Sequence, residues 1–332
     1  RRTEPIDAKR WRGKWDSLED MDAFGKAAAY LAEPLLAGIH AGDVDRLSVR
    51  ALFPRFVELE QTYGSLIRGF RAQPRGPSTG GPFRSLPGGL SELTRAIVAA
   101  LPAASIRTGT PVERIAREAT SELRVQTTTG ALQGPVVVLA TPAYVTSRIV
   151  RDLDPRLAQL CDEIPYASTA TVVLAFPRAA VQHRLDGSGF VVPRAEGSAI
   201  LAASWLSSKW AHRAPDDRVL MRAFVGGTRD PGATGRPDSA LISASLAALR
   251  PLLGISGEPL LARVYRWERS GAQHNLGHLA RVDAIERLLS SHPGLFVTGS
   301  AYRGVGIPDC VADGRRTGAQ VAKFLTDLPE RG

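Results

Sequence analysis

The last forty residues constrain the fold more than any other part of the chain. An apolar, β-prone run at 295–298 leads into a glycine-rich turn, and a helix is expected to begin near Ile307. Gly304 and Gly306 remove side chains that would keep a ligand off the backbone, and Pro308 removes an N–H that has no partner within the helix. The remaining N–H groups favour an anion or a carbonyl oxygen. The unit is therefore either a ligand-facing turn or a plain closing element of a sheet.

Composition indicates an ordinary globular protein with room for two domains. Of the 332 residues, 44% are hydrophobic and 23% are charged. The net charge of +9 comes almost entirely from arginine and suits an anionic partner: nucleic acid, phospholipid or a substrate with carboxylates. The arginines are scattered, without an aromatic-interleaved basic ribbon, so nucleic acid is not expected as a partner.

Cysteine and histidine spacing predicts neither a redox pair nor a metal site. Cys161 and Cys310 lie far apart, and nothing indicates an oxidising compartment. His274 and His278 have the i, i+4 spacing of helical metal ligands, but no carboxylate completes a set, so no metal is expected. No apolar run reaches the roughly 18 residues that span a bilayer. A cytoplasmic location is expected, with peripheral attachment to the cytoplasmic membrane left open.

Hydrophobic periodicity predicts a mixed α/β chain. Helical spacing over 18–36 and 49–60 predicts a helical start, and the Pro, Gly and Ser content of 73–82 predicts an exposed loop. The apolar run 136–140 is typical of a strand buried on both faces. The last strand and helix are expected to rejoin the sheet begun near residue 104. Strands are expected at SIRTGT, VERIARE, ELRVQTTT, GPVVVLATP, TATVVLAF, GFVVP, AILAASW and RVLMRAFV, and helices after SLPGG, at 238–253 and at 279–291.

Motifs along nearly the whole chain are similar to those of one family, in the same order. The run GSAYRGVGIPDC, with GR three residues later, resembles the C-terminal signature of the FAD-dependent protoporphyrinogen and coproporphyrinogen oxidases, within the flavin amine oxidase superfamily. EPLLAGIHAGDVDRLSVRALFPRFVELEQTYGSLIRG resembles the helical region of that family. SLPGGLSELTRAI with TGTPVERI, and RWERSGAQHNLGH, resemble two further segments. The joint order indicates the family, because each motif alone also fits plain packing.

The resemblance implies FAD as the cofactor and assigns residues to ligands. No catalytic side chain is assigned, because the flavin carries the chemistry and the protein orients it. Basic side chains are expected to meet substrate propionates, but the sequence does not single them out. The implied cofactor-binding residues are Val112, Trp267, Ser300, Val305, Gly306 and Ile307, and the implied substrate-binding residues are Gly38, Gly189 and Phe190.

The same resemblance implies four segments. Residues 1–80 form a helical region with a possible role at the membrane surface, and 82–150 form part of an FAD-binding, Rossmann-like domain. Residues 151–292 form a substrate-binding domain around a mixed sheet, and 293–330 return to the FAD-binding domain. The expected fold class is thus α/β with mixed α+β character and a discontinuous cofactor domain.

Two departures from the family pattern bear on the cofactor. Ala272 stands where the family has proline, and His274 stands where it has tyrosine. The fingerprint G-x-G-x-x-G is absent, and its nearest match, GVGIPDC, has cysteine in place of the third glycine. Because the chain also opens with Arg1, the pyrophosphate-binding turn and first strand are expected to lie outside it, leaving an incomplete FAD domain.

For the complete protein, the resemblance implies oxygen-dependent oxidation of a porphyrinogen to the porphyrin in heme biosynthesis. Each two-electron step passes a hydride to FAD, which molecular oxygen reoxidises. The resemblance does not distinguish protoporphyrinogen IX from coproporphyrinogen III. Two alternatives stay open: a related flavin amine oxidase or desaturase, and a non-catalytic remnant that binds an anionic ligand.

Expressed as 332 residues, the chain is expected to be inactive and to bind FAD poorly, because the phosphate-cradling turn is not among its motifs. Thermal unfolding with and without excess FAD checks this, since a ligand that binds only the folded state raises the melting temperature. An upward shift, with flavin absorbance retained after gel filtration, would contradict the expectation.

Overall fold

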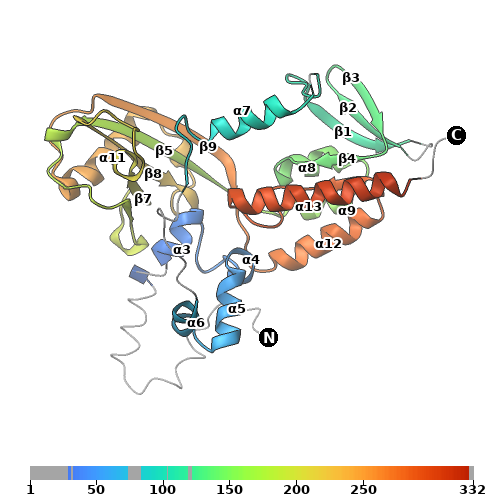
Figure 1. Cartoon of the computed structure of the whole chain (residues 1–332), viewed down its shortest axis with the longest axis horizontal. Helices are drawn as coiled ribbons and strands as arrows, with labels where there is room; N and C mark the ends of the chain where they lie inside the picture. Colours follow the sequence, from blue (N-terminus) through green and yellow to red (C-terminus); the bar gives the residue numbers. More distant parts are fainter. Residues whose placement is uncertain (1–28, 31–32, 74–83, 103, 119–121, 329–332) are drawn as a thin grey trace. The chain divides into compact units, whose positions relative to one another are not determined.

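The structure is a computed structural model that describes residues 29–30, 33–73, 84–102, 104–118 and 122–328 (Figure 1). Its contacts divide the chain into two compact units. The first unit comprises residues 1–47 and 166–276, and the second comprises 48–165 and 277–332. Both units mix helices and sheets, as predicted. The functions given to the four predicted segments stay predictions.

The first unit is built on a five-stranded antiparallel sheet of order β6-β7-β8-β5-β9. Helix α11 packs on the edge strand β9 and on β5 beside it, and α3 packs against β6 (Figure 1). The elements are α3 (Glu33–His40), β5 (Tyr166–Pro177), β6 (Gly189–Val191), β7 (Ala202–Trp205), α10 (Leu206–Lys209), β8 (Arg218–Gly226), α11 (Asp238–Leu253) and β9 (Leu261–Ala272).

Strict alternation in β5 and β8 gives this sheet one fully buried face. Ala170, Val172, Leu174 and Phe176 are buried at 0% exposure, while the residues between them are half-buried. They join a cluster with residues of β7, β8 and α11, which is the main hydrophobic core of the unit. The predicted strands of this unit are confirmed, as is the helix at 238–253.

Strand β9 is the element of this sheet that the sequence analysis missed. Most of its side chains are exposed or half-buried, so the strand can carry several charged residues and lacks a regular apolar face. Arg266, for example, reaches out to donate hydrogen bonds to Thr234 O, at 2.8 Å, and to Asp238 Oδ1, at 2.6 Å. An edge strand with charges does not carry the apolar run by which the other strands were predicted.

The second unit contains a two-stranded parallel sheet, a three-stranded antiparallel sheet and most of the helices. The final strand was expected to rejoin the sheet begun near residue 104, and this holds only in part. Phe296 of β10 pairs with Val138 of β4, but these two strands form a sheet separate from that of β1, β2 and β3. The elements are α4 (Val49–Leu52), α5 (Pro54–Tyr63), α6 (Leu66–Ala72), α7 (Ser91–Ala100), β1 (Val112–Arg117), β2 (Leu123–Thr127), β3 (Gly130–Gly134), β4 (Val137–Leu139), α8 (Ala143–Val150), α9 (Pro155–Asp162), α12 (His278–Ser290), β10 (Leu295–Val297) and α13 (Ile307–Thr326).

Two predictions about this unit are wrong. The run SIRTGT forms turns rather than a strand, since Gly109 adopts a left-handed φ of 65° that ends extended structure. The run 136–140 is not buried on both faces, because Val138 is 41% exposed. The predicted helix at 18–36 falls largely outside the described residues. Within the described part, no helix has the length and apolar composition to cross a membrane.

Candidate functional site

The turn between β10 and α13 exposes backbone, as the glycines predict. Gly299 has a φ of 118°, and a Cβ built there would meet nothing within 4 Å. Gly304 has a φ of 122°, and a Cβ there would lie 2.7 Å from the Cβ of Asp309. Both positions require glycine, the first by backbone conformation and the second also by close packing. The turn therefore offers bare backbone beside open space.

Helix α13 begins at Ile307, as predicted, without a side-chain cap. Gly306 is the N-cap and no side chain accepts from the first turn, while Pro308 has no N–H to satisfy. Over 20 residues, the aligned peptide dipoles leave partial positive charge at this end. An anionic or carbonyl oxygen fits there, and a flavin carries such oxygens on its ring system. The residues present thus fit the cofactor that the resemblance implies.

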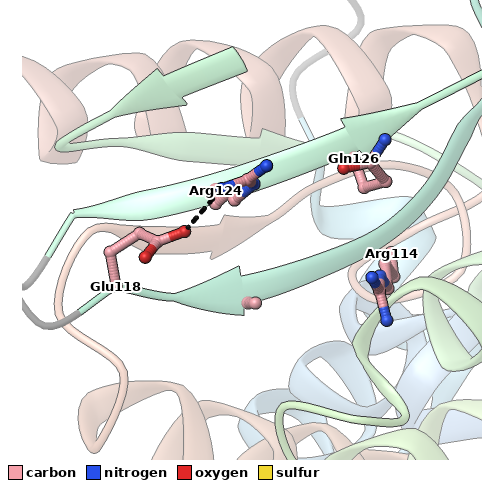
Figure 2. A pocket seen from close by; sticks show the side chains of 5 residues that line it. Arg114, Glu118, Arg124 and Gln126 are labelled. Atoms are coloured by element: carbon pink, nitrogen blue, oxygen red, sulfur yellow. Dashed lines mark hydrogen bonds and ion pairs between the residues drawn. The ribbon is translucent and has the colours of Figure 1, made fainter. Parts of the chain in front are cut away.

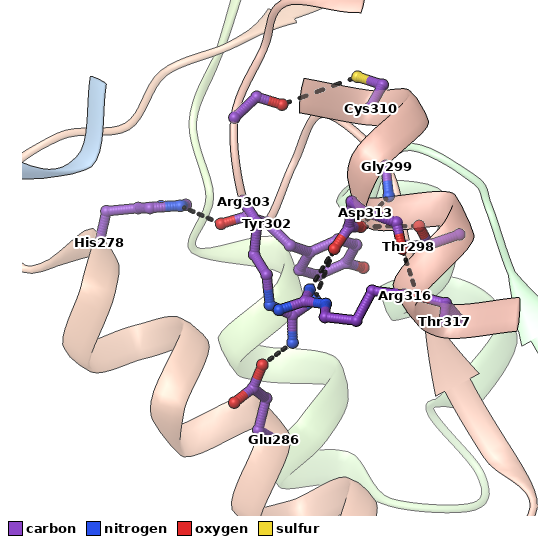
Figure 3. Close-up of polar contacts among 11 residues, drawn as sticks. His278, Glu286, Thr298, Gly299, Tyr302, Arg303, Cys310, Asp313, Arg316 and Thr317 are labelled. Atoms are coloured by element: carbon purple, nitrogen blue, oxygen red, sulfur yellow. Dashed lines mark hydrogen bonds and ion pairs between the residues drawn. The ribbon is translucent and has the colours of Figure 1, made fainter. Parts of the chain in front are cut away.

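Asp313 holds the turn to the helix (Figure 3). Its carboxylate accepts hydrogen bonds from Thr298 Oγ1 at 2.7 Å and from the Gly299 backbone N–H at 3.1 Å. It also pairs with Arg303, at 3.2 Å, and with Arg316. Arg303 continues the chain of charges to Glu286 of α12. One buried carboxylate thus fixes the start of the turn, its middle and the helix after it.

The surroundings of Asp313 stabilise its charged form. Burial alone would raise its pKa, since the side chain is only 3% exposed. The hydrogen bonds from Thr298 and Gly299 and the positive charges of Arg303 and Arg316 outweigh this, so the pKa of Asp313 lies below its ordinary value. The carboxylate stays ionised at neutral pH and acts as an anchor rather than a proton donor.

A second buried set supports the same turn through Tyr302. The Tyr302 hydroxyl donates to Thr146 Oγ1 at 3.3 Å. Tyr302 O lies 3.0 Å from His278 Nε2 (Figure 3). Burial lowers the pKa of His278 despite this contact. It also raises the pKa of Cys161 to about 12, so that thiol is inert. Cys310 is half-buried, and its Sγ lies 3.7 Å from Gly304 O.

The predicted cofactor residues fall into three places. Ser300, Val305, Gly306 and Ile307 are together on the β10–α13 turn, with Ile307 50% exposed. Val112 begins β1 and is 38% exposed. Trp267 lies on β9 of the other unit, 53% exposed. Their contacts with a cofactor stay predictions.

The strands that follow Val112 form a depression, drawn in Figure 2. It measures about 290 Å³ and is lined by side chains of β1 and β2. Within it Arg124 contacts Glu118 at 3.3 Å, while Arg114 lies 3.9 Å from the exposed Asp152. These are solvated surface pairs of small energetic weight, so the depression offers no specific ligand chemistry. The lining residues are Arg114, Ala116, Glu118, Arg124 and Gln126.

The predicted substrate residues lie on or beside β6, at one edge of the five-stranded sheet, and each has different neighbours. Gly38 of α3 faces Val191, 4.0 Å from where its own Cβ would be. Gly189 needs to be glycine, because a Cβ would overlap the carbonyl oxygen of Ala203 on β7. Phe190 packs against the hydrophobic core and meets Trp205 edge-on, with ring centroids 5.7 Å apart. Packing within the unit is thus sufficient to explain why Gly189 and Phe190 occupy these positions. Their contact with substrate stays a prediction.

Sequence reasoning missed Asp313. The available signal was the spacing of Asp313 and Arg316 on one predicted helix, which allows an i, i+3 ion pair. The contacts with Thr298 and Gly299 depend on how the turn folds back, which spacing does not show. Asp313 therefore becomes visible as the anchor of the turn only in three dimensions.

Comparison with known sequences places the chain among flavin enzymes. Residues 2–322 match the family described as flavin containing amine oxidoreductase. The chain is 34% identical to coproporphyrinogen III oxidase of Bacillus subtilis over 90% of this chain and 64% of that protein. It is 29% identical to chloroplastic protoporphyrinogen oxidase of Oryza sativa over 95% of this chain and 64% of that protein. The chain thus spans slightly less than two thirds of the length of these curated relatives.

Solved structures of flavin oxidases have a fold similar to that of this chain. A crystal structure from Exiguobacterium sp. 255-15, described as a putative protoporphyrinogen oxidase, superposes with a TM-score of 0.78 at 29% identity, covering 98% of this chain and 76% of that one. A putrescine oxidase superposes with a TM-score of 0.65 at 18% identity, covering 97% of this chain and 68% of that one. At that identity the second likeness shows the fold alone.

Replacing Asp313 by asparagine is expected to destabilise the chain by about 2 to 4 kcal/mol, because Arg303 and Arg316 lose their buried counter-charge. Urea denaturation measures the change. Because the folded pKa of Asp313 is lowered, its contribution is present above the pKa of the unfolded carboxyl and is lost as pH falls through the folded value.

The difference between the wild type and Asp313→Asn should therefore shrink on acidification. Asp327→Asn, at the exposed C-terminal end of the same helix, is the control and should change stability by less than about 0.5 kcal/mol. A pH-independent difference, or an equal effect of the control, would contradict the assigned role.

Proposed function

We propose, from the fact that this chain belongs to the family of flavin containing amine oxidoreductases, that its protein oxidises a porphyrinogen to the porphyrin with FAD. The observation that carries this proposal is the 34% identity to a coproporphyrinogen III oxidase across 90% of the chain. Similarity of that extent includes both compact units, and therefore both the β10–α13 turn and the five-stranded sheet. We place coproporphyrinogen III before protoporphyrinogen IX, since the curated protoporphyrinogen oxidase of Oryza sativa is 29% identical.

The chemistry divides between cofactor and protein. FAD, when bound, supplies the hydride acceptor of each two-electron step, and molecular oxygen is the proposed final oxidant. The part of this chain is to bind and orient. The uncapped start of α13 favours negative charge or a carbonyl oxygen beside it, and the bare backbone at Gly299 admits a flat ligand closely. Asp313 keeps this turn in one conformation, so little reorganisation is needed when a ligand binds.

Helix α6 supports a further proposal, peripheral contact with a membrane. Its sequence LIRGFRA alternates apolar and arginine side chains, and Ile67 and Phe70 are 65% and 50% exposed. Apolar side chains beside arginines suit an anionic lipid surface, where the former enter the interface and the latter meet headgroups.

The activity is tested with the complete protein, which adds the pyrophosphate-binding segment that the resemblance implies. This protein is loaded with FAD and given coproporphyrinogen III, protoporphyrinogen IX and a set of amines under air. Fluorescent porphyrin is expected from coproporphyrinogen III faster than its spontaneous oxidation, with consumption of oxygen. Heat-denatured protein with equal free FAD is the control for the spontaneous reaction. Oxidation of an amine with no porphyrin formed would replace the proposal by the related amine oxidase, and flavin-loaded protein without either activity would exclude both.

Membrane contact is tested by sedimentation with vesicles of phosphatidylglycerol or of phosphatidylcholine. Binding is expected to the anionic vesicles, and Ile67→Ser should weaken it about fivefold by removing an inserted apolar side chain. Leu252→Ser, which removes a comparably exposed side chain (60%) from α11, is the matched control. Equal losses from both variants, or no binding by the wild type, would contradict membrane contact through α6.

A further inference from the structure

The five-stranded sheet has a second face, opposite the hydrophobic core, on which the described residues form no buried cluster. Its side chains alternate with the core residues and are half-buried or exposed. Tyr265 and Trp267 are 48% and 53% exposed there, a large aromatic area for one surface. We call this the open face, and its members are Thr169, Thr171, Val173, Ser204, Arg222, Phe224, Arg263, Tyr265 and Trp267.

Strand register fixes how these side chains are arranged, because directly paired residues share a face. Phe224 of β8 pairs with Thr171 of β5, which pairs with Tyr265 of β9. Two residues further along β5, Val173 pairs with Arg222 of β8 on one side and with Arg263 of β9 on the other. Two strand spacings place the backbones of these arginines roughly 10 Å apart. The open face therefore presents an aromatic row beside a row with two guanidinium groups (strands in Figure 1).

Arg222 is held in place without a counter-charge. Its Nε donates to Ser204 Oγ at 3.1 Å, and its guanidinium lies over the Phe224 ring, 4.8 Å from the centroid. Among the described residues, no carboxylate lies within ion-pair distance of it, whereas other half-buried arginines have one, such as Arg229 with Glu33 at 3.0 Å. The two terminal nitrogens of Arg222 keep their donors for another partner.

The surroundings of Arg222 disfavour its positive charge in the absence of a counter-charge. Burial lowers the pKa of Arg222 below its ordinary value. Burial, and then the charge of Arg222, lower the pKa of Lys209 in α10. Two cations are thus kept close together on a partly desolvated surface, which a bound anion would stabilise.

We propose that Arg222 binds a carboxylate of the substrate while the aromatic row of the open face, Phe224 and Tyr265, contacts the macrocycle. The proposal rests on the proposed function, because it takes a tetrapyrrole with carboxylate side chains as the occupant. A guanidinium with two free donors matches a carboxylate in a bidentate pair. Arg263, in the same row, is the partner for a second carboxylate. A substrate with more carboxylates is thereby favoured over one with fewer.

The proposal is tested by fluorescence titration of the protein with coproporphyrin III, the product of the proposed reaction, and with its tetra-amide, which keeps the ring and lacks the charge. Arg222→Gln is expected to weaken coproporphyrin III binding about tenfold or more, the scale of one charge-assisted pair. Arg222→Lys should lie in between, because lysine keeps the charge but not the bidentate geometry. Tetra-amide binding should be the same for all three proteins.

Arg218→Gln is the matched control, since Arg218 lies on the same strand but is exposed and paired with Asp217 at 3.7 Å. It should bind coproporphyrin III like the wild type. Melting temperatures check folding, and if the glutamine variant unfolds, the lysine variant carries the comparison of acid with amide. Unchanged coproporphyrin III binding by Arg222→Gln, an equal loss for the tetra-amide, or no binding by the wild type would overturn the proposal.

The two proposals can fail separately. Porphyrin formation together with Arg222→Gln binding equal to that of the wild type would overturn the role of Arg222 and leave the proposed function standing. Loss of binding specific to the acid, in a flavin-loaded protein that leaves porphyrinogen unoxidised, would overturn the proposed function and support Arg222 as a carboxylate site.

Discussion

The buried carboxylate of Asp313 is the interaction on which the second unit depends. It joins the end of β10, the glycine turn and α13, and through Arg303 it reaches α12. The glycines give the turn its conformational freedom, which would leave it without a defined shape if nothing restrained it. Asp313 supplies that restraint from inside the unit, so the outer surface of the turn stays clear for a ligand. Rigidity and accessibility are thus provided by different residues.

Elements with strong periodicity could be predicted from the sequence, and so could the turn before Ile307. The helix at 238–253 and the strands β5 and β8 follow directly from apolar spacing, because each buries one regular face. Strand β9 was missed because an edge strand with exposed arginines lacks such a face. The expectation that Val138 is buried was wrong, because an apolar run does not show which neighbouring elements cover each side chain.

The candidate site was predictable only in part. The resemblance placed Ser300, Val305, Gly306 and Ile307 on one turn, and the structure has them there. It did not identify Asp313 or Arg222, because their roles depend on partners distant in sequence: Gly299 N–H for the first, Ser204 and Phe224 for the second. Phe190 shows the converse, since a residue in a matching motif can pack into the core. Motif order identifies a family, and side-chain direction decides what each position can touch.

The two cysteines of the chain differ in burial, and should therefore differ in their reaction with thiol reagents. Cys161 is fully buried, so alkylating reagents should reach it only on unfolding. Cys310 is half-buried in the first turns of α13, with its sulfur near Gly304 O. A probe attached to the folded chain would therefore be confined to the glycine turn. The molecule carries its own single-site reporter of how that turn responds to flavin.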